Sequence, residues 1–163
     1  MIFAYFFSFV ILLRIGELLL STKNEKWLIQ NGAVEYGRKH YPIIVVLHVL
    51  FFIALLIEYS LQRTPYCNYY LLGFYFIVLA CKFWIVLSLG KFWNTKIYHI
   101  AGAPLIKTGL YKYIKHPNYL VVIAEIAIIP LAFHLYCTAI IFTLLNLIIL
   151  RVRINEENKA LLI

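Results

Sequence analysis

Long apolar runs separated by short polar segments dominate this chain. A helix needs roughly 20 apolar residues to cross a hydrocarbon core of about 30 Å. The runs that approach this length predict membrane spans over residues 2–20, 43–61, 69–89, 119–133 and 135–150. The last two meet at His134 and are expected to form a tight helical hairpin. We therefore expect one all-α integral membrane domain over residues 1–163, with about five transmembrane helices.

Two polar segments interrupt the apolar pattern. Segment 21–41 predicts a short interfacial helix that ends at Asn31-Gly32, because glycine is common just past a helix C-terminus. Segment 90–118 is polar, basic and aromatic, and residues 95–100 alternate as a β-strand does. A loop of this length is more often functional than a simple connector is. We therefore expect segment 90–118 to form part of a functional site, together with the hairpin and tail of residues 119–163.

Composition supports the membrane assignment. Hydrophobic residues make up 64% of the chain and charged residues only 13%, about half the charged share of a typical soluble domain. The net charge of +8 does not indicate nucleic-acid binding, because the charges lie between apolar runs. The three cysteines show neither a CxxC pair nor zinc-ligand spacing, so no metal site is expected.

The distribution of basic residues predicts the topology. If the N-terminus is outside, segments 21–41, 90–118 and 151–163 face the cytoplasm and hold 12 of the 15 Lys and Arg residues. The outer segments then hold only Arg63. Positive residues concentrate on the cytoplasmic side of membrane proteins. The chain is therefore expected to be multi-pass, in a bacterial cell membrane, with its C-terminus in the cytoplasm.

Several ionisable residues lie inside the predicted spans. Arg14 and Glu17 are three residues apart and can form an ion pair, whereas Lys82 can extend its side chain to the interface. Glu58 lies near the outer end of its span and is expected to reach water. Glu125 has no obvious local partner, and an unpaired carboxylate at that depth is unfavourable. It is either functional, as a contact to a substrate, or a neutral carboxyl bonded to a neighbouring helix.

The predicted hairpin brings two distant polar segments together. Pro117 suits the first turn of a helix, whose free N–H groups favour an anionic group, and His116 precedes it. Arg153 and Glu157 are four residues apart on one helix face, with Glu156 alongside. These groups fit a zwitterionic, nucleotide-like ligand. The same spacing also fits an ordinary interfacial helix with an ion pair.

These two segments carry a resemblance to a known family. Residues 109–120 (GLYKYIKHPNYL) and 151–161 (RVRINEENKAL) resemble the two motifs of the isoprenylcysteine carboxyl methyltransferase family. Their order, their separation and the intervening hairpin match as well. Residues 14–48 look like the short bacterial members of the family. Lys115 stands where the family signature has arginine, which keeps the charge and loses the planar guanidinium.

The resemblance implies a methyltransferase that binds S-adenosyl-L-methionine at the cytoplasmic end of the hairpin and a lipophilic acceptor that arrives sideways from the bilayer. Carried over by position, the cofactor would be bound by Gly109, Tyr111, His116, Pro117, Tyr119, Glu156 and Glu157. Arg153 would lie near the acceptor oxygen, and we place Glu125 on the acceptor side by its depth. The membrane lipids are the only other partners expected, and the sequence does not give an oligomeric state.

The acceptor and the reaction class stay open at this point. The family's tail with Tyr and Arg residues is not present by Ile163, so alkylpyrone-like lipids methylated on an enol oxygen stand beside isoprenylcysteine-like lipids as candidates. Membrane sterol reductases that use NADPH also carry His-Pro-Asn-Tyr before a hairpin, although they usually have an acidic residue where this chain has Val122. A membrane scaffold without catalytic activity is the third alternative.

Overall fold

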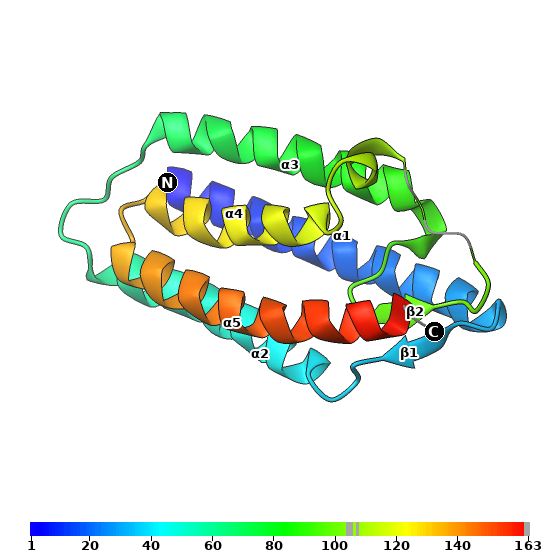
Figure 1. Cartoon of the computed structure of the whole chain (residues 1–163). Helices are drawn as coiled ribbons and strands as arrows, with labels where there is room; N and C mark the ends of the chain where they lie inside the picture. Colours follow the sequence, from blue (N-terminus) through cyan, green and yellow to red (C-terminus); the bar gives the residue numbers. More distant parts are fainter. Residues whose placement is uncertain (104–105, 107, 162–163) are drawn as a thin grey trace.

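The computed structural model describes residues 1–103, 106 and 108–161 of the chain. Figure 1 shows an elongated bundle of helices with a small β-ribbon at one end. Its helices are α1 (Ile2–Gln30), α2 (Tyr41–Leu61), α3 (Tyr69–Leu89), α4 (Pro117–Leu131) and α5 (Tyr136–Leu161). Short 3-10 turns, η1 (Gly90–Phe92) and η2 (Gly109–Lys112), lie between α3 and α4. The predicted all-helical membrane fold is confirmed at this level.

Four of these helices, α1, α2, α3 and α5, are long and apolar enough to cross a membrane. Helix α4 has 15 residues, which is about 22 Å of helix and less than a full hydrocarbon core. The multi-pass prediction is therefore confirmed for four spans. Helix α4 packs between α3 and α5, so its short length is accommodated by contact with its neighbours.

The predicted hairpin between the last two helices is present. The connecting residues turn tightly, with His134 in the left-handed region at φ 57°. The imidazole of His134 stacks on Tyr66 at 3.8 Å between ring centroids, and Gln62 Nε2 donates a hydrogen bond to the Phe133 carbonyl at 2.9 Å. Because α4 and α5 then run antiparallel in contact, His116 and Arg153 lie at the same end of the bundle.

Helix α1 is longer than predicted. The prediction of a separate interfacial helix within residues 21–41 is wrong, because α1 continues without a break to Gln30. Its predicted end at Asn31-Gly32 is confirmed, with Gly32 at φ 80°. Asn24 lies on this extension, and its Nδ2 donates to the Trp93 carbonyl at 2.7 Å, which holds the start of the long loop against the helix.

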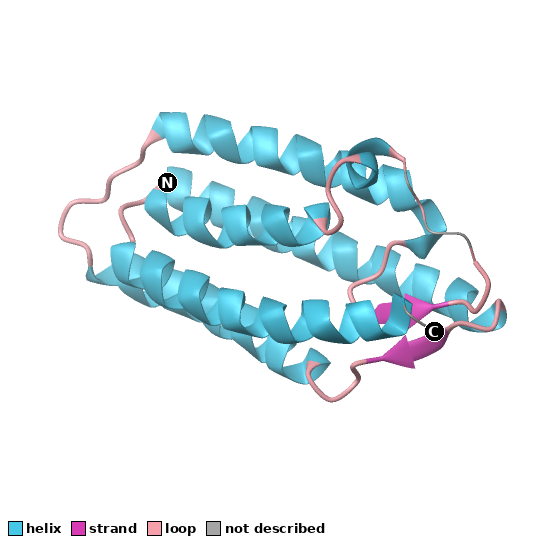
Figure 2. Cartoon of the chain, viewed as in Figure 1, coloured by secondary structure: helices cyan, strands magenta, loops and turns pink. Residues whose placement is uncertain are grey.

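The strand predicted from the alternation at residues 95–100 is confirmed as β2 (Ile97–His99). It pairs antiparallel with β1 (Val34–Tyr36), which the sequence pattern did not indicate. Figure 2 shows this ribbon beside the end of α1. Lys96 Nζ lies 2.6 Å from Glu25 Oε1, and this hydrogen bond raises the pKa of the Lys96 ammonium. The ion pair therefore ties the ribbon to α1.

The far end of the bundle is held by aromatic packing. Phe3 stacks on Tyr59 at 3.8 Å between ring centroids and meets Phe133 edge-on at 5.0 Å. The chain's N-terminus lies at this end, whereas the end of α5 lies near the β-ribbon (Figure 1). Glu58 also lies here, and its carboxylate accepts hydrogen bonds from the first amides of α5, with Thr138 N at 2.7 Å. Glu58 thus stabilises the start of α5.

Candidate functional site

Two adjoining cavities lie in the half of the bundle near the β-ribbon. The larger has a volume of about 230 Å³ and lies among α1, α2, α4 and α5. The smaller, of about 110 Å³, lies closer to the ribbon and to the N-terminus of α4. Both cavities are lined by Trp93, Asn94, Asn118, Tyr119 and Arg153. These five residues therefore form a common wall between an inner and an outer chamber.

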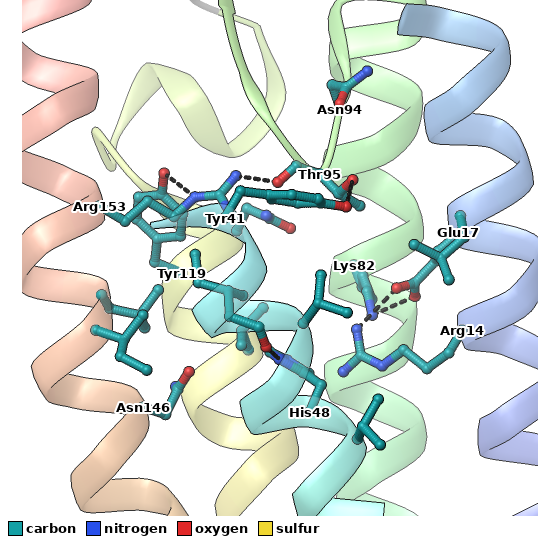
Figure 3. Close-up of a pocket in the computed structure, with 18 of the residues that line it drawn as sticks. Arg14, Glu17, Tyr41, His48, Lys82, Asn94, Thr95, Tyr119, Asn146 and Arg153 are labelled. Atoms are coloured by element: carbon teal, nitrogen blue, oxygen red, sulfur yellow. Dashed lines mark hydrogen bonds and ion pairs between the residues drawn. The ribbon is translucent and has the colours of Figure 1, made fainter. Parts of the chain in front are cut away.

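Arg153 is the centre of a hydrogen-bond chain across this wall. Its guanidinium is nearly buried and donates from Nε to Tyr119 Oη at 3.0 Å and from Nη2 to the Thr95 carbonyl at 2.5 Å (Figure 3). Tyr119 Oη in turn donates to Glu157 Oε2 at 2.5 Å. His116 Nδ1 lies 3.3 Å from the same oxygen. The chain joins α4, α5 and the loop before β2, so it fixes the geometry of the wall.

Several residues that line the smaller cavity carry unpartnered polar atoms. Trp93 Nε1, His116 Nε2 and Asn118 Oδ1 are buried and have no hydrogen-bond partner among the described residues. Buried polar atoms are normally hydrogen-bonded, so a cluster of such atoms indicates a missing ligand or water. Burial also raises the pKa of the Tyr111 phenol, which keeps it a neutral hydrogen-bond donor at this cavity. The smaller cavity thus offers donors and acceptors to a polar ligand.

The structure brings together most of the residues predicted for the cofactor. Tyr111, His116, Tyr119 and Glu157 line the smaller cavity, and Arg153 lines both. The other predicted residues lie elsewhere: Gly109, Pro117 and Glu156 line neither cavity.

Each of these three residues has another structural setting. A Cβ on Gly109, which has φ 57°, would lie 2.3 Å from Ser88 Oγ, so glycine is required there for close packing against α3. Pro117 is buried in the first turn of α4. Lys159 binds Glu156 at 2.7 Å, and that hydrogen bond lowers the pKa of the Glu156 carboxyl. Their predicted contact with a cofactor therefore stays a prediction.

Glu125 has partners on two neighbouring helices that the sequence did not reveal, which agrees with the alternative of a carboxyl bonded to a neighbouring helix, although both partners are cations. It is 2% exposed and accepts from Arg14 Nη2 at 2.8 Å and from Lys82 Nζ at 3.1 Å. The predicted extension of Lys82 to the interface is wrong, because Lys82 points inward and contacts both Glu125 and Glu17. The predicted pair of Arg14 and Glu17 is present at 2.9 Å. These four side chains form a quartet of zero net charge that joins α1, α3 and α4, with Lys82 and Glu125 buried and Arg14 and Glu17 partly exposed.

The quartet borders the larger cavity without placing Glu125 in it. Arg14, Glu17 and Lys82 line the cavity, whereas Glu125 does not (Figure 3). Removing one member would leave an uncompensated charge in a low-dielectric region. The quartet therefore stabilises the cavity wall, and its geometry favours a structural role for Glu125 over contact with a substrate.

Sequence reasoning missed several residues of the larger cavity. His48 and Asn146 line it from α2 and α5, and Tyr41 lines it nearer the ribbon. Tyr41 Oη lies 3.2 Å from Thr95 Oγ1, which links α2 to the common wall. A signal was available for two of them, because His48 and Asn146 are strongly polar side chains in the middle of apolar runs.

Comparison with known proteins gives a consistent result. A model of the isoprenylcysteine carboxyl methyltransferase (ICMT) family matches residues 71–163. A Bacillus subtilis protein described as uncharacterized protein YpbQ is 40% identical over 157 residues, covering 94% of this chain and 93% of that protein. An uncharacterized protein of Haemophilus influenzae is 30% identical over 158 residues, covering 95% of this chain and 92% of that protein. No solved structure gives a significant match.

Proposed function

The chain belongs to the isoprenylcysteine carboxyl methyltransferase family, and from this premise we propose that it is a methyltransferase that uses S-adenosyl-L-methionine. The proposed acceptor is a lipophilic molecule with a carboxyl or acidic hydroxyl oxygen, of the isoprenylcysteine or alkylpyrone kind. The observation that carries the proposal is the pair of cavities with Arg153 and Tyr119 in their common wall. A polar cofactor and an apolar acceptor can then meet at one place.

The smaller cavity suits the cofactor by its chemistry. Glu157 offers a carboxylate to an ammonium group, and the unpartnered atoms of Trp93, His116 and Asn118 can bond to polar groups of a nucleoside. Small-molecule sites usually measure about 300–1,000 Å³, so we expect binding to widen this cavity. When bound, the cofactor supplies an activated methyl group to the acceptor.

The larger cavity suits an acceptor that arrives from the lipid. Leu18 on α1 and Val45 and Val49 on α2 line it and are also 51%, 42% and 53% exposed. The cavity wall between α1 and α2 therefore extends to the lipid-facing surface. Nearer the end of the bundle that lies opposite the β-ribbon, Phe7 on α1 and Phe52 on α2 meet edge-to-face at 5.8 Å between ring centroids and close the space between these two helices. An acyl or prenyl chain can lie in the open part while its head reaches the wall.

Arg153 has the position to hold the acceptor oxygen. Its guanidinium already donates to Tyr119 and Thr95, and it keeps further N–H groups for an oxygen in either cavity. An ionised carboxylate or enolate needs no strong base, so alignment is the main task of the protein. In the proposed transfer the oxygen would bond to the methyl carbon as the carbon–sulfur bond broke, with the bonding pair left on sulfur. Arg153 would fix the oxygen in line throughout.

The proposed topology follows from charge and from the opposite positions of the N-terminus and the end of α5. The end of the bundle with the β-ribbon holds the described residues of the basic segments 21–41, 90–118 and 151–163, so we assign it to the cytoplasm. The two cavities then lie in the cytoplasmic half of the membrane. A soluble cofactor reaches the smaller one from the cytoplasm, and a lipid reaches the larger one from the bilayer.

Ligand titration separates this proposal from the alternatives of an NADPH-dependent reductase and a scaffold without activity. We expect the purified protein in detergent to bind S-adenosylhomocysteine and not NADPH. Glu157→Gln should weaken that binding by about ten- to a hundredfold, because one charge-assisted contact is lost. Glu35→Gln is the matched control and should change little, since Glu35 lies on β1 and lines neither cavity. NADPH binding alone, or equal affinities in all three proteins, would contradict the proposal.

A further inference from the structure

Two polar residues of the larger cavity take no part in the wall where the reaction is placed. Asn146 on α5 is 2% exposed, and its Nδ2 has no hydrogen-bond partner among the described residues. His48 on α2 lines the same cavity. A buried carboxamide without a partner inside a membrane-spanning helix is unfavourable, so it indicates a group that binds there.

The imidazole of His48 is oriented by its own helix. Its Nδ1 lies 2.8 Å from the Ile44 carbonyl oxygen, which can only accept, so Nδ1 carries the proton. In the neutral ring, Nε2 is then a hydrogen-bond acceptor. His48 thus offers the cavity an acceptor, whereas Asn146 Nδ2 offers a donor.

Helix geometry places His48 and Asn146 at one depth. His48 follows Tyr41 by seven residues on α2, and Asn146 precedes Arg153 by seven on the antiparallel α5. Seven residues make two turns, so each lies on the same face as its neighbour and about 10 Å farther from the ribbon. Tyr41 and Arg153 both contact Thr95, and Figure 3 shows His48 and Asn146 beyond that layer.

We propose that His48 and Asn146 form a second subsite for the acceptor, which recognises a neutral hydrogen-bonding group of the lipid head deeper in the cavity than the methylated oxygen. This inference rests on the proposed function. The subsite binds an O–H or N–H at His48 Nε2 and a carbonyl or ether oxygen at Asn146 Nδ2. The arginine and lysine of the adjacent quartet are neutralised by their carboxylates, so the deep end of the cavity has no net attraction for a second anion.

The specificity that follows is for a lipid with two polar groups in its head. A simple long-chain fatty acid has one polar group, which Arg153 would occupy, and nothing to place at the second subsite. An S-prenylcysteine with an acylated amine, or a hydroxypyrone with an alkyl tail, has further hydrogen-bonding groups beside the oxygen to be methylated. Such heads leave fewer buried polar atoms without a partner.

The test measures methyl transfer to three probes: an N-acetyl S-prenylcysteine, an alkyl hydroxypyrone and hexadecanoic acid. We expect wild-type protein to use one of the first two at least about tenfold better, by kcat/KM, than hexadecanoic acid. Asn146→Leu and His48→Phe should each raise the KM for that probe about ten- to a hundredfold, with kcat and S-adenosylhomocysteine affinity little changed. His48→Gln should restore much of the loss, because its side-chain oxygen can replace Nε2 as an acceptor.

Thr143→Val is the matched control. Thr143 Oγ1 is also buried without a partner among the described residues and lies on the same helix as Asn146, but it lines neither cavity. Variants of His48 and Asn146 that behave like Thr143→Val would overturn the subsite, and so would equal use of hexadecanoic acid. A polar pocket that holds only water predicts that the variants change the melting temperature and leave the KM unchanged, which also overturns it. If wild-type protein binds no S-adenosylhomocysteine and transfers no methyl group, the proposed function itself has failed.

Discussion

A Lys82→Met variant is expected to lose about 3–5 kcal/mol of stability against unfolding, because it leaves the Glu17 and Glu125 carboxylates with only Arg14 to neutralise them. Lys82 and Glu125 are 4% and 2% exposed, so the Glu125 carboxylate lies in a low-dielectric region where the loss of a charged partner is costly. The measurement is thermal or denaturant unfolding in a fixed detergent. The expected loss is a large part of the stability of an ordinary domain.

The double variant Lys82→Met with Glu125→Leu should recover much of this loss. It removes one cation and one anion, which leaves the neutral pair of Arg14 and Glu17 in place. Lys159→Met is the surface control: Lys159 forms an i,i+3 pair with Glu156 at 71% side-chain exposure, and such pairs contribute about 0–1 kcal/mol. A double variant less stable than either single variant would show that the quartet is not held together by charge balance.

Replacing Arg153 with Met is expected to lower the rate of methyl transfer by about a hundred- to a thousandfold, as the loss of one oriented donor does in other group-transfer sites. Arg153 lies in the wall that both cavities share, and it fixes Tyr119 and the Thr95 carbonyl as well. The rate of the Arg153→Lys variant should lie between those of wild type and Arg153→Met, because an ammonium keeps the charge and cannot donate in the same planar arrangement.

Arg151 provides the matched control for that prediction. It lies two residues earlier on α5, is exposed, and lines neither cavity. Arg151→Met should leave the rate within about threefold of wild type, as surface substitutions usually do. Unfolding curves for both variants separate a catalytic loss from a folding loss. An Arg153→Met protein that is folded and still active at the wild-type rate would remove Arg153 from the mechanism.

The apolar pattern was sufficient for the apolar parts of the helices and for the hairpin, because a helix in lipid must be long and apolar whatever it packs against. It did not predict the polar extension of α1 to Gln30. The hairpin then placed His116 near Glu157, which the structure shows at 3.3 Å between Nδ1 and Oε2. The motif residues that line the smaller cavity were found for the same reason. Local sequence and topology were enough for these features.

The pairing of charges was not predictable from the same pattern. Lys82 and Glu125 are on different helices, and which face each helix turns inward depends on packing that hydropathy does not describe. From hydropathy alone, Lys82 could extend to the interface, and no partner could be assigned to Glu125. The strand β1 was missed for a similar reason, since three residues between a helix end and a glycine carry little periodic signal, and its partner β2 is distant in sequence.

Methyl transfer to lipid is the measurement that tests the central claim most directly. Purified protein in lipid nanodiscs is incubated with methyl-labelled S-adenosylmethionine and a lipid pool extracted from bacterial membranes. The lipids are then recovered in an organic phase and analysed by mass spectrometry. The account predicts a labelled lipid that is heavier than its precursor by one CH2 and that is strongly reduced with Arg153→Met. A protein that leaves the lipid pool unlabelled and oxidises NADPH in its presence would contradict the account.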